Sequence, residues 1–364
     1  MNKRAIVYVL GAVLLIGAAL MLPPLLVALI YHEVSGWYFL WVMLGAAVLG
    51  ALALRLGGGK RAVMYAKEGL IAVALSWIVL SLVGALPFTL SGQIPFYLDA
   101  VFEMISGFTT TGSSILPAVE ELDKCMLFWR SFSHWIGGMG ILVFLLAVLP
   151  LVGGSNMQLM KAESPGPSVG KLVPKVRFTA RILYVLYVAL TLLQVLVMLM
   201  GGMTLYEALC TSFGTAGTGG FGIYGDSIAR FSPFLQWAIT VFMIAFGVNF
   251  NVYFLLYMRR PKDALHCEEM HWYLGIIAAA ALLICANAYD MTLTLENNLR
   301  QSFFQVASII TTTGFATTDF NLWPVFSKAL LLCLMLIGSC AGSTAGGFKI
   351  SRVVILFKMI RGQL

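Results

Sequence analysis

Residues 109–112 and residues 311–314 both read Thr-Thr-Thr-Gly. Each copy follows an apolar segment that is too short to cross a bilayer, which takes roughly 20 helical residues. A looser version lies between them, where the segment that begins at Glu207 leads into Thr-Ala-Gly-Thr-Gly-Gly-Phe at residues 215–221. One such tetrapeptide is typical of a turn. Three related copies at intervals of roughly 100 residues indicate an internally repeated membrane protein.

The composition supports this interpretation. Of the 364 residues, 60% are hydrophobic and 11% are charged, and the mean hydropathy is +0.91. A water-soluble domain of this length could not bury so much apolar surface in one core. Apolar runs long enough for transmembrane helices, the last of them interrupted, lie at residues 5–30, 36–54, 69–91, 126–152, 182–202, 233–257, 272–289 and 324–357. We therefore predict an all-α polytopic membrane protein.

The basic residues predict the orientation of the chain. Lys and Arg are retained on the cytoplasmic side of a membrane. A cytoplasmic N-terminus leaves only five of the 23 basic residues outside: Lys124, Arg130, Arg230, Arg300 and Lys328. Both Thr-Thr-Thr-Gly segments then face the exterior. The net charge of +7 comes mainly from basic residues in the cytoplasmic segments, where anionic lipid headgroups can neutralise them. We therefore expect membrane lipid as a partner, and no nucleic acid.

The short segments before the three loops are predicted to enter the membrane from outside and end near its centre. They cover residues 97–108, 204–214 and 299–310. The carboxyl end of each half-helix carries roughly half a negative elementary charge, which favours a dehydrated cation. A following glycine can take positive φ, so that successive carbonyls turn toward one axis, as in potassium filters. Asp99, Glu103 and Glu207 open or line these segments and are predicted to attract cations.

A glycine-rich stretch interrupts the last apolar run. Residues 338–347 read Gly-Ser-Cys-Ala-Gly-Ser-Thr-Ala-Gly-Gly, which cannot hold a regular helix as well as the flanking leucines do. Two interpretations are open, an intramembrane loop and close helix packing through small residues. A phosphate-binding loop is disfavoured, because the required spacing is not met and no strand precedes it. No nucleophile and base pair is recognisable, so we expect neither an enzyme nor a cofactor.

These motifs together resemble the TrkH branch of the Trk/Ktr/HKT superfamily of potassium transporters. The resemblance covers the whole chain and rests on residues 102–112, 135–140, 219–221, 311–319 and 342–349. It implies four helix–pore loop–helix (M1-pore-M2) units around a central pathway, preceded by two extra helices. The implied divisions are 1–67 for the extra helices, then 68–178, 179–270 and 271–364 for three units. The fourth unit is expected to be absent from this chain.

The resemblance also implies the functional residues. The K⁺ selectivity filter would comprise Thr110, Thr111, Gly112, Thr218, Gly219, Gly220, Thr312, Thr313 and Gly314. K⁺ itself would be bound at Thr110, Thr111, Thr218, Gly219, Thr312 and Thr313. The second loop lacks the triple threonine, which leaves its register open by one residue. A gate beneath the filter would comprise Gly338, Gly342, Ser343, Thr344, Gly346 and Gly347.

The implied activity is gated K⁺ uptake across the bacterial inner membrane. The resemblance further implies a homodimer and a cytoplasmic nucleotide-binding regulatory partner of the TrkA type. Residues 155–181 are either a solvated linker or the surface on which that partner lands. Two alternatives stay open. One is a symporter that couples K⁺ to H⁺ or Na⁺, which an ionisable residue facing the pathway would favour. The other is a non-conducting fragment that only binds other subunits.

Overall fold

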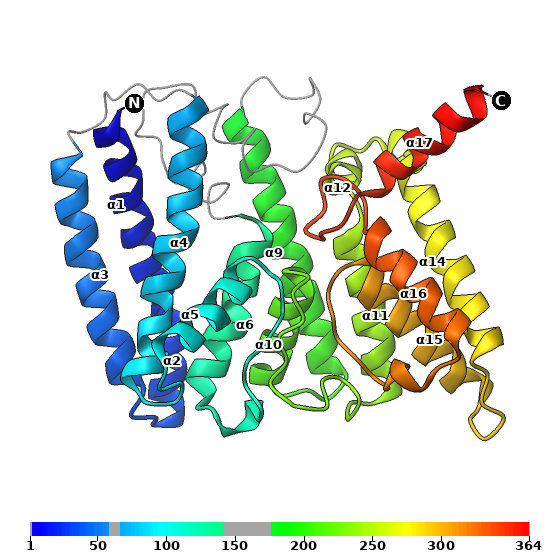
Figure 1. Ribbon diagram of the computed structural model, residues 1–364, viewed down its shortest axis with the longest axis horizontal. Coiled ribbons are helices and arrows are strands. Elements are labelled where there is room, and N and C mark those ends of the chain that lie inside the picture. The colour runs from blue at the N-terminus through cyan, green and yellow to red at the C-terminus, as the bar shows by residue number, and fades with distance from the viewer. Residues whose placement is uncertain (1, 58–65, 141–175, 364) are drawn as a thin grey trace. The chain divides into compact units, whose positions relative to one another are not determined.

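The computed structural model describes residues 2–57, 66–140 and 176–363. The described residues form α-helices and short 3-10 turns without any strand, which confirms the all-α prediction (Figure 1). The chain divides into two compact units, Met1–Tyr184 and Val185–Leu364, called unit 1 and unit 2 below. We describe each unit by itself.

In the described part of unit 1, six α-helices and one 3-10 turn precede the division. They are α1 (Lys3–Leu20), α2 (Leu22–Tyr31), α3 (Gly36–Leu56), α4 (Ala66–Leu90), α5 (Tyr97–Phe108), η1 (Val119–Glu121) and α6 (Lys124–Gly138). Helices α1 and α3 approach closely through Gly11 and Gly50, where a Cβ on Gly11 would lie 2.8 Å from the Gly50 carbonyl oxygen. The short helix α5 packs against α4 and α6, and its last residue, Phe108, makes an edge contact with the ring of Trp129.

The described part of unit 2 contains both short and long helices. Helix α9 (Val176–Met200) crosses the division between the units. The helices that follow are α10 (Leu205–Ala216), α11 (Pro233–Gly247), α12 (Phe250–Tyr257), α13 (Pro261–Leu265), α14 (Glu268–Asn287), α15 (Leu295–Ile310), η2 (Phe320–Leu322), α16 (Val325–Ile337) and α17 (Ile350–Gln363). Helix α14 lies beside α15 and α16, and buried residues such as Tyr273, Ile310 and Leu331 form their shared core (Figure 1).

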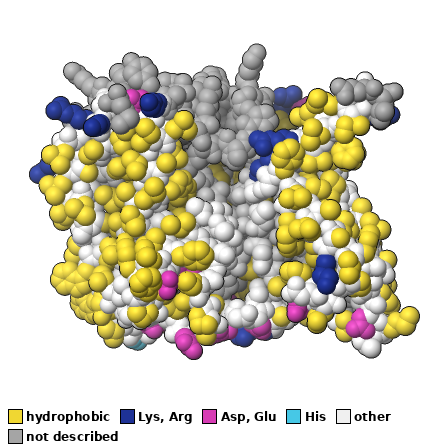
Figure 2. Space-filling model, viewed as in Figure 1, with side chains coloured by type: hydrophobic (Ala, Val, Ile, Leu, Met, Phe, Trp, Pro, Cys, Tyr) yellow, Lys and Arg dark blue, Asp and Glu magenta, His cyan; other side chains and the backbone are white. Residues whose placement is uncertain are grey.

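Several helices have the length and composition of membrane spans. Among the described residues these are Lys3–Tyr31, Gly36–Leu56, Lys67–Leu90, Ile182–Met200 and Glu268–Asn287. Figure 2 shows many hydrophobic side chains over the helices at the left and at the right of the view, and α3 exposes Trp37, Trp41 and Leu52, among others. In unit 1, Lys3 and Arg4 at the start of α1 and Arg55 near the end of α3 are exposed. The prediction of a multi-pass membrane protein is confirmed.

The predicted span at residues 233–257 is wrong as a continuous helix. Helices α11 and α12 meet at an angle of 88°. Val248 takes an extended conformation, and the Asn249 side chain accepts a hydrogen bond from the Asn251 amide at 2.9 Å, so a new helix begins there. Both halves are apolar, so hydropathy alone does not reveal the bend. The interruption predicted in the last run does occur, since α16 ends at Ile337 and α17 begins at Ile350.

Candidate functional site

The three predicted loops share one backbone conformation. A threonine with left-handed φ comes two residues after each short helix, at Thr110 (+55°), Thr218 (+53°) and Thr312 (+55°). A glycine with positive φ follows two residues later, at Gly112 (+76°), Gly220 (+74°) and Gly314 (+87°). This pattern resolves the register of the second loop: residues 218–220 correspond to residues 110–112 and 312–314.

The hydrogen bonds of the three loops agree with this register. The Thr111, Gly219 and Thr313 amides donate to the carbonyl oxygens of Ser106, Gly214 and Ser308, at 2.9, 3.1 and 2.9 Å. Each loop therefore ends its short helix in a Schellman motif, in which glycine usually takes the left-handed position. Here threonine takes it three times. A β-branched residue with positive φ costs on the order of 1–3 kcal/mol, and such strain persists mainly at functional sites.

The threonine hydroxyls distinguish the second loop from the other two. The Thr109 and Thr111 hydroxyl oxygens are 2.8 Å apart, and those of Thr311 and Thr313 are 2.7 Å apart. In the second loop the corresponding residues are Gly217 and Gly219, so both members of the hydroxyl pair are replaced together. The second loop therefore lacks the hydrogen-bonded pair of threonine hydroxyls but has the same backbone conformation as the other two loops.

In unit 2 the second and third loops lie against each other. A Cβ built on Gly220 would lie 2.0 Å from the Thr313 carbonyl oxygen, a distance that no side chain tolerates. Gly314 has no such neighbour within 4 Å in the described structure. The predicted filter residues 218–220 and 312–314 are therefore brought together by the fold of unit 2. Residues 110–112 belong to unit 1.

Residues 338–349, the intramembrane loop, contact both of these loops. The Thr218 hydroxyl shares its hydrogen between the Gly217 carbonyl at 2.7 Å and the Thr344 carbonyl at 3.1 Å. The Gly346 amide donates to the Thr312 hydroxyl at 2.8 Å. The Ser339 hydroxyl donates to the carbonyl of Ile310, the last residue of α15, at 2.9 Å. Both contacting threonines are the strained left-handed residues. The predicted gate residues and two of the predicted filter loops therefore share one location.

The neck of the intramembrane loop is closed by its glycines. Gly338 and Gly347 have φ of +69° and +85°, and a Cβ on Gly338 would lie 2.6 Å from the Gly346 carbonyl oxygen. The Phe348 amide donates to the Leu336 carbonyl at 3.1 Å, which joins the two ends of the loop. Lys349, which the sequence analysis did not assign to the gate, is buried and donates its ammonium to the Ala345 carbonyl.

Glu103 does not attract cations at the surface as predicted, because it is fully buried in unit 1. It forms an ion pair with Arg130 of α6, with a 2.6 Å hydrogen bond from the arginine Nε. The same carboxylate accepts hydrogen bonds from the Ser114 hydroxyl at 2.9 Å and the Ile115 amide at 3.1 Å, so it fixes the chain that leaves the first loop. Gln305 lies at the equivalent position of α15 and donates to the Thr318 carbonyl at 3.1 Å.

Glu207 stays charged at the start of α10. It forms a capping box with Thr204 and accepts a hydrogen bond from the Tyr224 hydroxyl at 2.6 Å. Burial acts to raise its pKa, but the hydrogen bonds from Tyr224 and Thr204 outweigh this and hold the pKa of Glu207 below its usual value. Glu207 therefore caps α10, and its attraction of cations stays a prediction.

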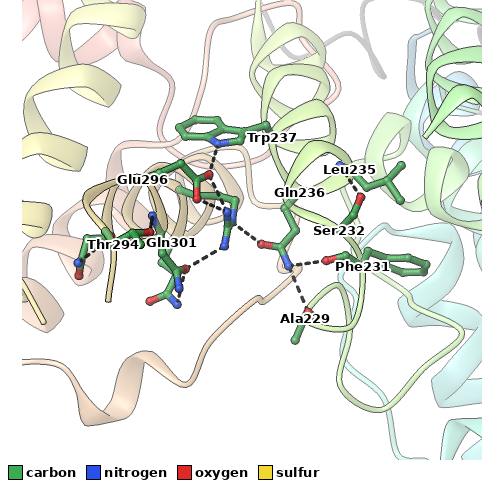
Figure 3. A network of polar contacts seen from close by, with 12 residues as sticks. Ala229, Phe231, Ser232, Leu235, Gln236, Trp237, Thr294, Glu296 and Gln301 are labelled. Atoms are coloured by element: carbon green, nitrogen blue, oxygen red, sulfur yellow. Dashed lines mark hydrogen bonds and ion pairs between the residues drawn. The ribbon is translucent and has the colours of Figure 1, made fainter. Parts of the chain in front are cut away.

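An arginine on α15 connects the third short helix to α11. Arg300 donates to the Gln236 side-chain oxygen at 2.9 Å and to the Glu296 carboxylate at 2.5 Å. Figure 3 shows Gln236 reaching in turn toward the backbone of Ala229 and Phe231, with bonds of 3.2 and 3.0 Å. These carbonyls lie in the segment that follows the second loop. The network therefore ties the surroundings of loops two and three together.

One group of possible metal ligands has another explanation. Glu33, Asp123 and Cys125 in unit 1 place ligand atoms within 4.8 Å of one another. Both Glu33 carboxylate oxygens, however, accept hydrogen bonds from the first amides of α6, at 2.8 and 2.9 Å. Helix capping accounts for Glu33, and the Asp123 carboxylate accepts hydrogen bonds from the Ser35 hydroxyl and the Gln93 side-chain amide.

Comparisons with known proteins identify the family. The family model named TrkH and described as a cation transport protein matches residues 46–284 and 280–364. The chain belongs to the TrkH family. A Trk system potassium uptake protein TrkH of Salmonella typhimurium is 38% identical over all of this chain, which spans 77% of that relative. The potassium uptake protein TrkG of Escherichia coli is 30% identical.

A solved TrkH structure has the same fold. The crystal structure of the potassium transporter TrkH from Vibrio parahaemolyticus superposes with a TM-score of 0.85 at 32% sequence identity. The match covers 98% of this chain and 75% of that one. The resemblance that the sequence motifs suggested is therefore confirmed at the level of family and fold.

Proposed function

We propose that this chain carries K⁺ into a bacterial cell through a filter lined by backbone carbonyls. The single observation that supports it most is the convergence of two Thr/Gly loops with the break between the apolar helix α16 and helix α17. Irregular backbone at membrane depth is tolerated only where it is buried in protein or lines a water-filled cavity. The TrkH relatives, which are named as potassium uptake proteins, support K⁺ as the ion.

In this proposal the three short helices aim their carboxyl ends at the permeating ion. Residues 110–112, 218–220 and 312–314 replace the water shell of K⁺ with carbonyl oxygens. The strained threonine and the glycine two residues later set the direction of these carbonyls. The repeating units extend over residues 68–178, 179–270 and 271–364, and residues 1–67 form the two preceding helices. We place the N-terminus in the cytoplasm.

The intramembrane loop acts as the gate. Its Gly338, Gly342, Ser343, Thr344, Gly346 and Gly347 backbone closes the pathway below the filter. It is held there by the hydroxyls of Thr218 and Thr312. Opening has to exchange these two hydrogen bonds for others. We further propose a homodimer and a TrkA-type nucleotide-binding partner; the suggested landing segment, residues 155–181, falls almost wholly outside the described residues.

The proposal is tested by K⁺ uptake in bacterial cells that lack their own uptake systems. The chain is expressed alone and, because its relatives are longer, also fused to the remaining residues of one of them. Growth at low K⁺ with either form supports the proposal, and no uptake with both contradicts it. Uptake that needs a Na⁺ or pH gradient at fixed membrane potential would instead establish the symporter.

The filter residues are tested by Gly314→Ser. A side chain there meets no neighbour within 4 Å, but it is strained at the native φ of +87°. The loop should shift to relieve this strain, and the selection of K⁺ over Na⁺ should fall. Gly202→Ser is the matched control, because Gly202 has φ of +94°, also meets no neighbour within 4 Å and lies outside the loops. Equal selectivity in the two variants would refute the filter assignment.

A further inference from the structure

One carboxylate in unit 2 joins three separate segments of the chain. Glu269 lies in the first turn of α14 and is half-buried. Its Oε1 accepts hydrogen bonds from the Ala341 amide at 2.6 Å and the Ser351 amide at 3.2 Å. Its Oε2 accepts one from the Asn249 side-chain amide at 3.3 Å. A single side chain thus contacts the intramembrane loop, the start of α17 and the bend between α11 and α12.

The bend and the loop are also joined through their backbones on both sides of Asn249. The Cys340 amide donates to the Gly247 carbonyl at 3.2 Å, and the Phe250 amide donates to the Gly342 carbonyl at 3.1 Å. A Cβ on Gly342 would lie only 3.1 Å from the Asn249 side-chain oxygen. The first half of the intramembrane loop therefore rests on the bend, and Glu269 holds this contact from the side of α14.

The chemistry of these bonds makes the carboxylate hard to replace. Hydrogen bonds to an ionised acceptor are roughly twice as strong as neutral ones. Ala341 is buried, so its amide loses its acceptor if the carboxylate moves away. The preceding residue, Glu268, has a different environment: it pairs with Lys358 at 2.6 Å, and both side chains are more than half exposed. Such surface pairs contribute little, which makes Glu268 a control one residue away.

We propose that Glu269 is a positioning residue that latches the intramembrane loop in the conformation described here. This inference rests on the proposed gating role of that loop. Because the same carboxylate holds Ala341 and Ser351, displacement of the Glu269 side chain frees both the loop and the start of α17. Movement of α14 at its first turn would therefore release both ends of the loop together.

The test uses a native reporter, Cys340, which lies fully buried in the intramembrane loop. Purified protein is treated with N-ethylmaleimide, and the modification of each cysteine is followed by peptide mass spectrometry. In Glu269→Gln the rate at Cys340 should rise about tenfold, the change expected when one strong hydrogen bond is lost. In Glu268→Gln it should stay at the wild-type rate. Exposed Cys333 serves as the internal reference, with an unchanged rate in all variants.

An unchanged rate at Cys340 in Glu269→Gln would overturn the proposal. So would an equal rise at Cys285, a buried thiol on α14, because that would mean general unfolding rather than release of the loop. If Glu269→Gln cannot be purified, Asn249→Ser removes one of the three bonds and should give a smaller rise, and no rise would overturn the latch. K⁺ flux is measured in parallel: faster modification without higher flux keeps the latch but contradicts the gating role of the loop.

Discussion

Replacing Gly220 with alanine tests the contact between the second and third loops. The new Cβ would lie 2.0 Å from the Thr313 carbonyl oxygen, so one loop has to move. The φ of +74° adds a conformational cost of roughly 1 kcal/mol. Overpacking of this kind costs about 1–3 kcal/mol more. We therefore expect Gly220→Ala to destabilise unit 2 by roughly 2–4 kcal/mol.

The matched control is Gly314→Ala. Gly314 has a similar φ of +87° but no neighbour within 4 Å, so only the conformational cost of roughly 1 kcal/mol applies. Thermal unfolding of the two purified proteins is compared, and the midpoint of Gly220→Ala should be several degrees lower, since 1 kcal/mol corresponds to roughly 2–4 °C at this size. Equal midpoints would mean that the two loops do not approach each other as described.

Three further predictions concern groups around the loops. Glu103→Gln removes the carboxylate that pairs with the buried Arg130 guanidinium and should lower stability by about 3–5 kcal/mol. If thermal unfolding shows a loss no larger than that of Glu268→Gln, the ion pair is not buried as described. Thr218→Val and Thr312→Val remove the hydroxyls that hold the intramembrane loop, so the K⁺ leak in proteoliposomes should rise severalfold. The control is Thr311→Val, which should leave the leak unchanged because the Thr311 hydroxyl donates to Ala307 of the helix that precedes it. In Arg300→Lys the ammonium cannot donate to Gln236 and Glu296 at once as the guanidinium does, so stability should fall by about 1–3 kcal/mol. A lysine variant as stable as wild type in thermal unfolding would show that the network does not need both arginine hydrogen bonds.

The sequence alone determined the features that depend on local composition. Long apolar runs predict membrane-spanning helices, because the bilayer core offers no water and a helix satisfies its own backbone hydrogen bonds. The glycine-rich residues 338–347 predict a break, because they cannot sustain the flanking helix. The repeated Thr-Thr-Thr-Gly, together with the motifs at residues 135–140, 219–221 and 342–349, suggested the TrkH family, which the comparisons confirm. Each of these signals is contained within one short stretch of the chain.

Only the tertiary structure decided the features that depend on distant contacts. The register at Thr218 followed from backbone angles, because its neighbouring glycines do not match the threonines of the other loops. The bend at Asn249 was hidden in an apolar run, and Glu103 became a buried partner of Arg130 rather than a surface charge. Glu269 meets Ala341 and Ser351 across 72 and 82 residues of sequence. Such contacts leave no local sequence pattern. A glutamate looks identical in the sequence whether water or a distant loop donates the hydrogen bonds to its carboxylate.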